Sequence, residues 1–371
     1  MVNDHPFSRR FGCRVTDSYT YRGQRLVVLE NELLRVAVLP EKGAEITAFH
    51  YKPADVDPLL RLPGDPRPPT PYPATIPSSD GAFMDAYSGG WQEMFPNAGG
   101  PCQVAGAQFG RHGEVALLPW RWAITEDHPE RVAVRFRVRT VRTPFYLERT
   151  MSLDSGRAVL TLDEVVVNEG DEKIAFIWGH HPAFGEPFLD GTCTLDVPAE
   201  RVEVHDGPSD PVQRLTPGSS GPWPVMPGAD GQPLDLRPIP GPESHHADML
   251  YLTGLQQGWY ALTNHRLGLG FAMAWPVEMF PVLWVWQEFC GSRGYPWYRN
   301  AYALGLEPCT SFATTGLAGL AEVIQAGRER HLSPGERLTA GLKAIIFATD
   351  GAPGVAEVTS DGNVKLLELT E

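Results

Sequence analysis

The sequence contains few cysteines and no excess of positive charge. Its five cysteines are odd in number and widely spaced, without the two-residue spacing typical of zinc sites, so we interpret them as buried free thiols. The 31 basic side chains stand against 45 acidic ones, which gives a formal net charge of −14. Because binding to phosphate backbones depends on clustered Lys and Arg, we predict no nucleic-acid partner.

Long apolar runs and nucleotide-binding motifs are also absent. Stretches such as Ile174–Trp178 fall far short of the roughly 20 residues that a membrane helix needs, so we expect no membrane partner. Residues 1–10 show neither a secretory signal nor an anchor, and we expect a cytoplasmic location. The sequence has no Gly-Lys-Ser/Thr loop, no Gly-x-Gly-x-x-Gly leading into a helix and no Gly-x-Ser-x-Gly elbow. Nucleotide binding and serine hydrolysis therefore lose their main support.

Short alternating segments separated by Gly and Pro run through the chain. In Arg131–Arg139, valines and a phenylalanine alternate with alanine and arginines, and this period of two predicts a strand with one buried face. Similar segments are 25–29, 33–39, 159–167, 174–178, 259–263, 282–286 and 342–347. We therefore predict a mainly β protein.

Helical patterns are few, and the best covers Leu317–Gly327. Two segments are interpreted as long loops: residues 62–77, which are rich in Pro, and residues 206–243, which are rich in Pro, Gly and Asp. Long loops on β scaffolds often frame binding sites. No internal repeat or break in composition divides the sequence, so we predict one β domain over residues 1–371. Two packed β domains are the alternative. No feature indicates an oligomeric state.

Two adjacent pairs stand out among the 11 histidines. His180 and His181 follow an apolar strand and precede a Pro-Gly turn, so an imidazole there can face a cleft and act as a general acid. The alternative is that they only satisfy loop backbone groups. His245 and His246 lie in a polar loop that ends at Asp248, and there we favour a solvated loop over a functional site.

Glu307 occupies an unusual setting for a carboxylate, since it follows an apolar run and precedes a proline. Burial there would raise its pKa toward the range of a general base, although a structural, salt-bridged glutamate is the alternative. Aromatic residues crowd the preceding 25 positions, namely Trp284, Trp286, Tyr295, Trp297 and Tyr298. Such rings suit the C–H face of a sugar, but they also suit plain core packing.

Glycine-rich segments suggest close approach of the backbone to a ligand. They are Gly89–Gly100, which contains Trp-Gln-Glu-Met-Phe-Pro-Asn, and Gly110–Gly113, which contains Arg111 and His112 and is followed by Trp120.

Taken in order, these segments resemble the aldose 1-epimerase (galactose mutarotase-like) superfamily. Residues 31–46 look like its opening strand pair, 91–99 its Phe-Pro-x-x-Gly segment, and 111–113 with Trp120 its His-Gly segment followed by Trp. Residues 181–184 resemble its His-x-aromatic-Phe motif, and 306–308 its late Glu-Pro element. The likeness spans about residues 26–347, and the order and spacing of the motifs carry it.

The resemblance implies a large antiparallel β supersandwich with few short helices and an enzyme that interconverts the α and β anomers of a monosaccharide. Glu307 would be the general base on the C1 hydroxyl and His181 the general acid on the ring oxygen. Neither a cofactor nor a metal is required.

Several residues would contact the sugar if the resemblance holds. His112 matches the second histidine of the family, Asp248 its sugar-binding aspartate, and Trp286 a stacking platform. Arg111 is the nearby candidate for the arginine that many members carry after the Phe-Pro-x-x-Gly segment. The acid is His180 or His181, and we choose His181 because it directly precedes Pro-x-Phe.

Two other functions are also compatible with the sequence. The same fold can serve as a non-catalytic carbohydrate-binding protein, because fold alone does not settle activity. A different lyase or isomerase chemistry, or a metal site that uses His180, His181 and His112, is the third possibility, although the spacing of these histidines is not diagnostic for a metal.

Overall fold

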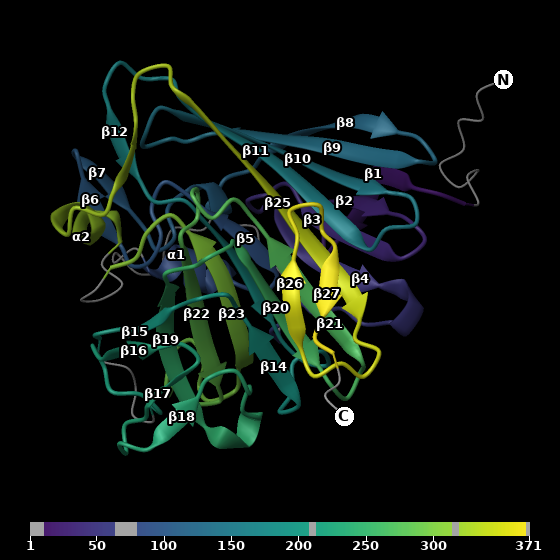
Figure 1. The fold of residues 1–371 in the computed structure, drawn as a ribbon. Helices are drawn as coiled ribbons and strands as arrows, with labels where there is room; N and C mark the ends of the chain where they lie inside the picture. The colour runs from purple at the N-terminus through teal and green to yellow at the C-terminus, as the bar shows by residue number, and fades with distance from the viewer. Residues whose placement is uncertain (1–10, 64–79, 208–212, 314–318, 369–371) are drawn as a thin grey trace.

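The computed structural model describes residues 11–63, 80–207, 213–313 and 319–368. Two large antiparallel sheets dominate it (Figure 1). The first sheet has eleven strands in the order β1 (Arg14–Tyr21), β2 (Gln24–Glu30), β3 (Leu34–Leu39), β4 (Glu45–Tyr51), β5 (Trp91–Met94), β13 (Gly179–Phe184), β23 (Tyr302–Cys309), β22 (Val282–Phe289), β19 (His246–Thr253), β15 (Arg201–Val204) and β16 (Ser220–Pro222).

The second sheet has eight strands, in the order β14 (Cys193–Asp196), β20 (Trp259–Asn264), β21 (Leu269–Ala274), β25 (Arg337–Ala348), β11 (Val159–Asn168), β10 (Phe145–Asp154), β9 (Arg131–Arg139) and β8 (Arg121–Asp127). Four strand pairs lie outside the two sheets: β6 (Cys102–Val104) with β7 (Ala107–Phe109), β12 (Ile174–Phe176) with β24 (Arg330–Leu332), β17 (Val225–Pro227) with β18 (Pro233–Asp235), and β26 (Val355–Val358) with β27 (Val364–Leu366).

Helices are a minor part of the described chain. The α-helices there are α1 (Asp80–Ala86) and α2 (Leu320–Gln325), and three short 3-10 turns lie at Lys52–Ala54, Val115–Leu117 and Pro242–Ser244. No helix within the described ranges is long and apolar enough to cross a membrane.

The core lies between the inner faces of the two sheets. The ring of Phe271 on β21 has its centroid 5.4 Å from that of Phe49 on β4 and 4.9 Å from that of Phe184 on β13. One buried apolar cluster extends from Cys13 to Ile346 along the chain. This arrangement confirms the predicted β supersandwich, and because a single cluster joins both sheets we propose that they form one domain.

Strand β9 shows how the sequence pattern produces this packing. Its four residues Val132, Val134, Phe136 and Val138 are buried in the core, whereas Arg135 and Arg137 alternate with them and are partly exposed. The period of two therefore predicts the strand and its buried face correctly.

Three predicted segments differ from the structure in detail. The strand predicted over Ile174–Trp178 ends at Phe176, because the N–H groups of Ile177 and Trp178 bond to the Pro96 carbonyl and the Thr310 hydroxyl instead of to a ladder. The predicted loop 206–243 contains the short strands β16, β17 and β18. The predicted helix is observed over Leu320–Gln325, while its start at Leu317 and residues 64–77 of the other predicted loop lie outside the described residues.

Candidate active site

A cleft with a volume of about 420 Å³ lies on the outer face of the eleven-stranded sheet. Leu304 and Leu306 of β23 point into the core, so Glu307, which alternates with them, points to the opposite face. Aromatic rings form much of the cleft wall, namely Phe83, Tyr87, Trp284, Trp286, Tyr295 and Trp297. The charged and imidazole groups that line it are Arg111, His112, His181 and Glu307.

Glu307 and His181 face one another across neighbouring strands. In the antiparallel register of β13 and β23, Ala183 pairs with Gly305, which places His181 next to Glu307. The His181 Nε2 atom lies 3.5 Å from Glu307 Oε1, at ion-pair distance. Both carboxyl oxygens and His181 Nδ1 are buried without a hydrogen-bond partner. Buried polar groups are almost always satisfied, so these atoms are available to a ligand.

The electrostatics of the cleft favour the neutral form of both residues. Burial holds the pKa of Glu307 well above its usual range. Burial also lowers the pKa of His181 to about 4, with the charge of Arg111 adding to that effect. Both shifts favour a protonated carboxyl group on Glu307 and a neutral imidazole on His181.

Gly305 makes room for the carboxyl group of Glu307. A Cβ atom at this position would lie 2.6 Å from Glu307 Oε1, which is too close, and 3.1 Å from Cε3 of Trp286, which is a tight contact. The glycine therefore lets the carboxyl group and the indole ring share the surface of β23 and β22.

The Phe-Pro-x-x-Gly segment positions His112. Its Asn97 side chain donates hydrogen bonds to the carbonyls of Gly100 and Gly110, and its Oδ1 accepts one from the N–H of Leu320. The Gly99 N–H donates to His112 Nδ1 at 3.2 Å, which leaves the proton of a neutral imidazole on Nε2.

His112 is buried, and its ring centroid lies 5.1 Å from that of His181. Burial, together with His181 and Arg111, lowers the pKa of His112 well below its ordinary value. A neutral His112 can donate one hydrogen bond from Nε2, which suits a sugar hydroxyl. Arg111 lines the same cleft beside it. The structure thus brings five predicted residues together: Glu307, His181, His112, Arg111 and Trp286.

His180 lies on the opposite face of β13 and does not line the cleft. Its Nδ1 accepts a hydrogen bond from Trp91 Nε1 at 3.3 Å, and its Nε2 lies 3.0 Å from Glu164 Oε2 on the second sheet. The imidazole is fully buried there. Of the two adjacent histidines, only His181 faces the cleft, and the prediction that His180 contacts the sugar does not fit this placement.

Asp248 is also placed away from the cleft. Its neighbour Met249 lines the cleft, so the alternation of β19 turns Asp248 to the other face. There the carboxylate accepts a hydrogen bond from the Arg214 N–H at 3.3 Å and lies 3.7 Å from Arg214 Nε. The predicted role of Asp248 in sugar binding does not fit this placement, because its side chain faces away from the cleft.

Trp286 lies where a stacking platform is expected. Its ring centroid is 5.9 Å from that of His181 and 5.2 Å from that of Trp297. Tyr87, which the sequence analysis missed, completes the wall with a centroid 5.5 Å from that of His181.

The hydroxyl of Tyr87 is buried without a hydrogen-bond partner. Burial and the charges of Glu307 and Glu45 raise the pKa of this phenol well above its ordinary value, so it remains a donor. Phe83 and Tyr87 are spaced four residues apart at α1 and their rings stack with centroids 5.5 Å apart. The four-residue spacing predicts that the two rings lie on one face of a helix, but not that this face borders the cleft.

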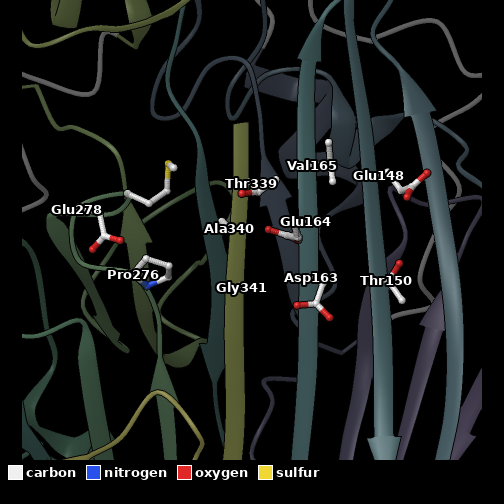
Figure 2. A pocket seen from close by; sticks show the side chains of 11 residues that line it. Glu148, Thr150, Asp163, Glu164, Val165, Pro276, Glu278, Thr339, Ala340 and Gly341 are labelled. Atoms are coloured by element: carbon white, nitrogen blue, oxygen red, sulfur yellow. The ribbon is translucent and has the colours of Figure 1, made fainter. Parts of the chain in front are cut away.

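A second depression of about 570 Å³ lies on the eight-stranded sheet (Figure 2). Glu148 and Asp163 extend from neighbouring strands β10 and β11, and Glu278 lies opposite them. Glu148 already accepts a hydrogen bond from the Tyr146 hydroxyl at 2.7 Å. Of the described residues that line this depression, none is aromatic or a histidine. It therefore offers carboxylates without an imidazole or an aromatic wall, and the cleft remains the better candidate for a sugar site.

Within the described part of the chain, no three His, Cys, Asp or Glu side chains form a group that could hold a metal ion. The metal site considered for His180, His181 and His112 is not assembled, because His180 points to the opposite face from the other two.

The fold is similar to that of solved galactose mutarotase-like proteins. The structure is similar to that of a candidate aldose 1-epimerase from Klebsiella pneumoniae, with a TM-score of 0.67 and 13% identity over 90% of this chain and 83% of the other. It is also similar to a galactose mutarotase-like protein from Clostridium acetobutylicum, with a TM-score of 0.59 and 13% identity over 90% and 98% of the two chains. A galactose mutarotase related enzyme from Lactobacillus acidophilus matches with a TM-score of 0.56 and 16% identity over 87% and 98%.

Identities this low establish the shared fold and nothing finer. Residues 21–218, more than half of the chain, match the family described as "Domain of unknown function (DUF4432)", and the chain belongs to this family. No curated protein matches the sequence.

Proposed function

We propose that the protein is an aldose 1-epimerase-like enzyme that interconverts the α and β anomers of a monosaccharide. The observation that carries this proposal is the pair formed by Glu307 and His181, 3.5 Å apart in an aromatic-walled cleft, with both carboxyl oxygens unsatisfied. Such a pair can hold one proton and exchange it with a substrate, which is what ring opening and closing of a sugar require.

The reaction begins with transfer of one proton from Glu307 to His181. A sugar hydroxyl that donates to Glu307 favours the carboxylate, so the proton of the pair moves to His181. Glu307 removes the proton from O1 as His181 protonates the ring oxygen and the bond between C1 and that oxygen breaks. The open aldehyde rotates about the bond from C1 to C2. Ring closure returns both protons by the reverse transfers, and the face of C1 that is attacked decides the anomer.

The remaining side chains of the cleft would hold the sugar. Trp286 would stack on a C–H face, and His112 Nε2 and Arg111 would donate to hydroxyl groups. This reaction needs no cofactor. We also keep a cytoplasmic location as a prediction.

The test is anomer interconversion, followed by polarimetry and saturation-transfer NMR, across a panel of freshly dissolved aldoses. We expect wild type to accelerate conversion of at least one sugar and Glu307→Gln to lower kcat/KM by about 10²–10⁴-fold. The control is Glu288→Gln, which changes another buried glutamate whose Oε1 accepts the N–H groups of Gly291 and Ser292 outside the cleft.

Two results would contradict the proposal. If Glu307→Gln keeps wild-type rates, Glu307 is not the base. If sugars bind the wild type but none is interconverted faster than in buffer, the protein is instead a carbohydrate-binding protein on this fold.

A further inference from the structure

A second cavity of about 440 Å³ borders the candidate active site. Both cavities are lined by Tyr87, Tyr295 and Trp297, together with Met84 and Pro296. The two spaces therefore adjoin one another at these residues. The neighbouring space, hereafter the outer cavity, has a volume similar to that of the cleft. A ligand confined to the cleft therefore leaves the outer cavity open.

The outer cavity has its own polar side chains. Asp85, Ser88 and Asn300 line it, and none of these residues lines the cleft. Carboxylate, hydroxyl and amide groups are the partners that sugar hydroxyls need. Tyr298 also lines this cavity, and 68% of its surface is exposed. An exposed ring beside polar groups offers a stacking surface for a second sugar ring.

The loop that presents these rings is held in place. The Tyr295 hydroxyl donates to Asp85 Oδ1 at 2.6 Å and so ties the loop to α1. The backbone N–H of Tyr298 donates to the Gly294 carbonyl at 2.7 Å, and that of Arg299 to the Ser292 carbonyl at 2.8 Å. Tyr298 and Arg299 are both in the left-handed region, with φ of 47° and 58°. This conformation costs about 1 kcal/mol or more per residue and persists only where the surroundings fix it.

We propose that the outer cavity is a second sugar subsite, which binds a pyranose ring joined by a glycosidic bond to the reducing sugar in the cleft. This inference rests on the proposed function for the placement of the reducing end beside Glu307 and His181. The substrate class is then a reducing disaccharide or longer oligosaccharide. Tyr298 supplies the stacking face, and Asn300 and Ser88 supply hydrogen bonds to its hydroxyl groups.

The test compares the affinity of disaccharides with that of their reducing-end sugars by isothermal titration calorimetry. The probes are glucose and three disaccharides with glucose at the reducing end, namely maltose, cellobiose and lactose. Each is titrated into wild type and into Tyr298→Asn. Asn tolerates the left-handed conformation, so the variant keeps the loop backbone. The control is Tyr19→Asn, which removes another exposed tyrosine, on β1.

We expect at least one disaccharide to bind wild type about 10-fold or more tightly than glucose, and Tyr298→Asn to reduce that ratio at least 5-fold. Tyr19→Asn should leave the ratio at the wild-type value. The proposal is overturned if no disaccharide binds more tightly than glucose, or if the ratio survives in Tyr298→Asn.

Anomer interconversion measured on the same samples separates the two proposals. Conversion of sugars without a preference for disaccharides would retain the proposed function and reject the subsite. A disaccharide preference that Tyr298→Asn removes, without conversion of any sugar, would retain the subsite and reject the enzyme. Binding of none of these sugars would reject the subsite as stated.

Discussion

The two faces of β13 each carry a histidine–glutamate pair. The pair on the core face has a structural role, whereas the pair on the cleft face is the candidate acid and base. On the core face, His180 Nε2 lies 3.0 Å from Glu164 Oε2, and its other ring nitrogen accepts a hydrogen bond from Trp91. On the cleft face, His181 Nε2 lies 3.5 Å from Glu307 Oε1, while His181 Nδ1 and both oxygens of Glu307 lack a partner.

Charge balance also differs between the two faces. The guanidinium of Arg149 lies 4.0 Å from Glu164 and 3.6 Å from Glu93, which gives the buried carboxylates of the core a cation. Glu307 has no such cation as an ion-pair partner among the described residues, only the imidazole of His181. In the core pair both imidazole nitrogens have partners and the carboxylate lies near a guanidinium, so this pair links the two sheets. The cleft pair lacks both features, so it can exchange its proton with a ligand.

A large loss of activity should come from crowding the cleft pair while both of its side chains are kept. In Gly305→Ala the new methyl group lies within 2.6 Å of Glu307 Oε1, so the carboxyl group must move. We expect a loss of about 100-fold in kcat/KM for anomer interconversion, because small misplacements of a reacting group have effects of that size. The control is Gly341→Ala on β25, where the nearest atom to a new Cβ is 3.6 Å away. Equal rates in Gly305→Ala and wild type would show that the position of the carboxyl group is not critical.

A smaller effect is expected at the rim of the cleft pair. Tyr87→Phe removes a buried hydroxyl that has no partner in the protein, so its loss should not lower the free energy of unfolding. If the hydroxyl donates to the sugar, kcat/KM should fall about 10-fold, which corresponds to one hydrogen bond of roughly 1.4 kcal/mol. Steady-state kinetics and thermal unfolding check both parts. If kcat/KM is unchanged but the free energy of unfolding falls, Tyr87 has a structural role and does not contact the sugar.

On the core face, Glu93 should make the free energy of unfolding depend on pH. Burial and the nearby Glu164 raise the pKa of Glu93 from an ordinary value of 4.5 to about 7. Because the folded state holds this proton more tightly than the unfolded state, the contribution is complete below pH 4.5. It is lost as the pH rises through 7, by about 3 kcal/mol at most.

The variant Glu93→Gln should remove this pH dependence. It keeps an acceptor for Trp178 Nε1, which now donates to Glu93 Oε1 at 2.9 Å. In urea unfolding the variant should match wild type near pH 5 and exceed it in stability at pH 8. The control is the exposed Glu130→Gln. A variant less stable than wild type at pH 8 would mean that the ion pair of Glu93 with Arg149 outweighs the burial of its charge.

Which residues face the core and which face the cleft could largely be predicted from alternation along single strands. His180 has the same parity as Phe184, a large apolar residue that belongs to the core, so the sequence already contained the signal that turns His180 inward. Asp248 likewise shares its parity with Leu250 and Leu252, and applying that rule to it would have removed it from the sugar site.

The rest of the site depends on contacts that no local pattern records. Pairing of β13 with β23 joins residues more than 100 positions apart in sequence, and only that register brings His181 to Glu307. The family resemblance supplied this pair, whereas the residue pattern alone left each with a structural alternative. Tyr87 was missed because its role comes from how α1 packs over the sheet, which the periodicity of a seven-residue helix does not determine.

The most direct measurement compares His181→Asn with His180→Asn for anomer interconversion by saturation-transfer NMR and for free energy of unfolding by urea. His181→Asn should lose about 10²–10⁴-fold in rate and keep its stability. His180→Asn should lose about 3–5 kcal/mol of stability, since Glu164 is left buried without its partner, and keep its rate per folded molecule. The opposite pattern, in which His180→Asn is inactive but stable and His181→Asn is active, would contradict the account.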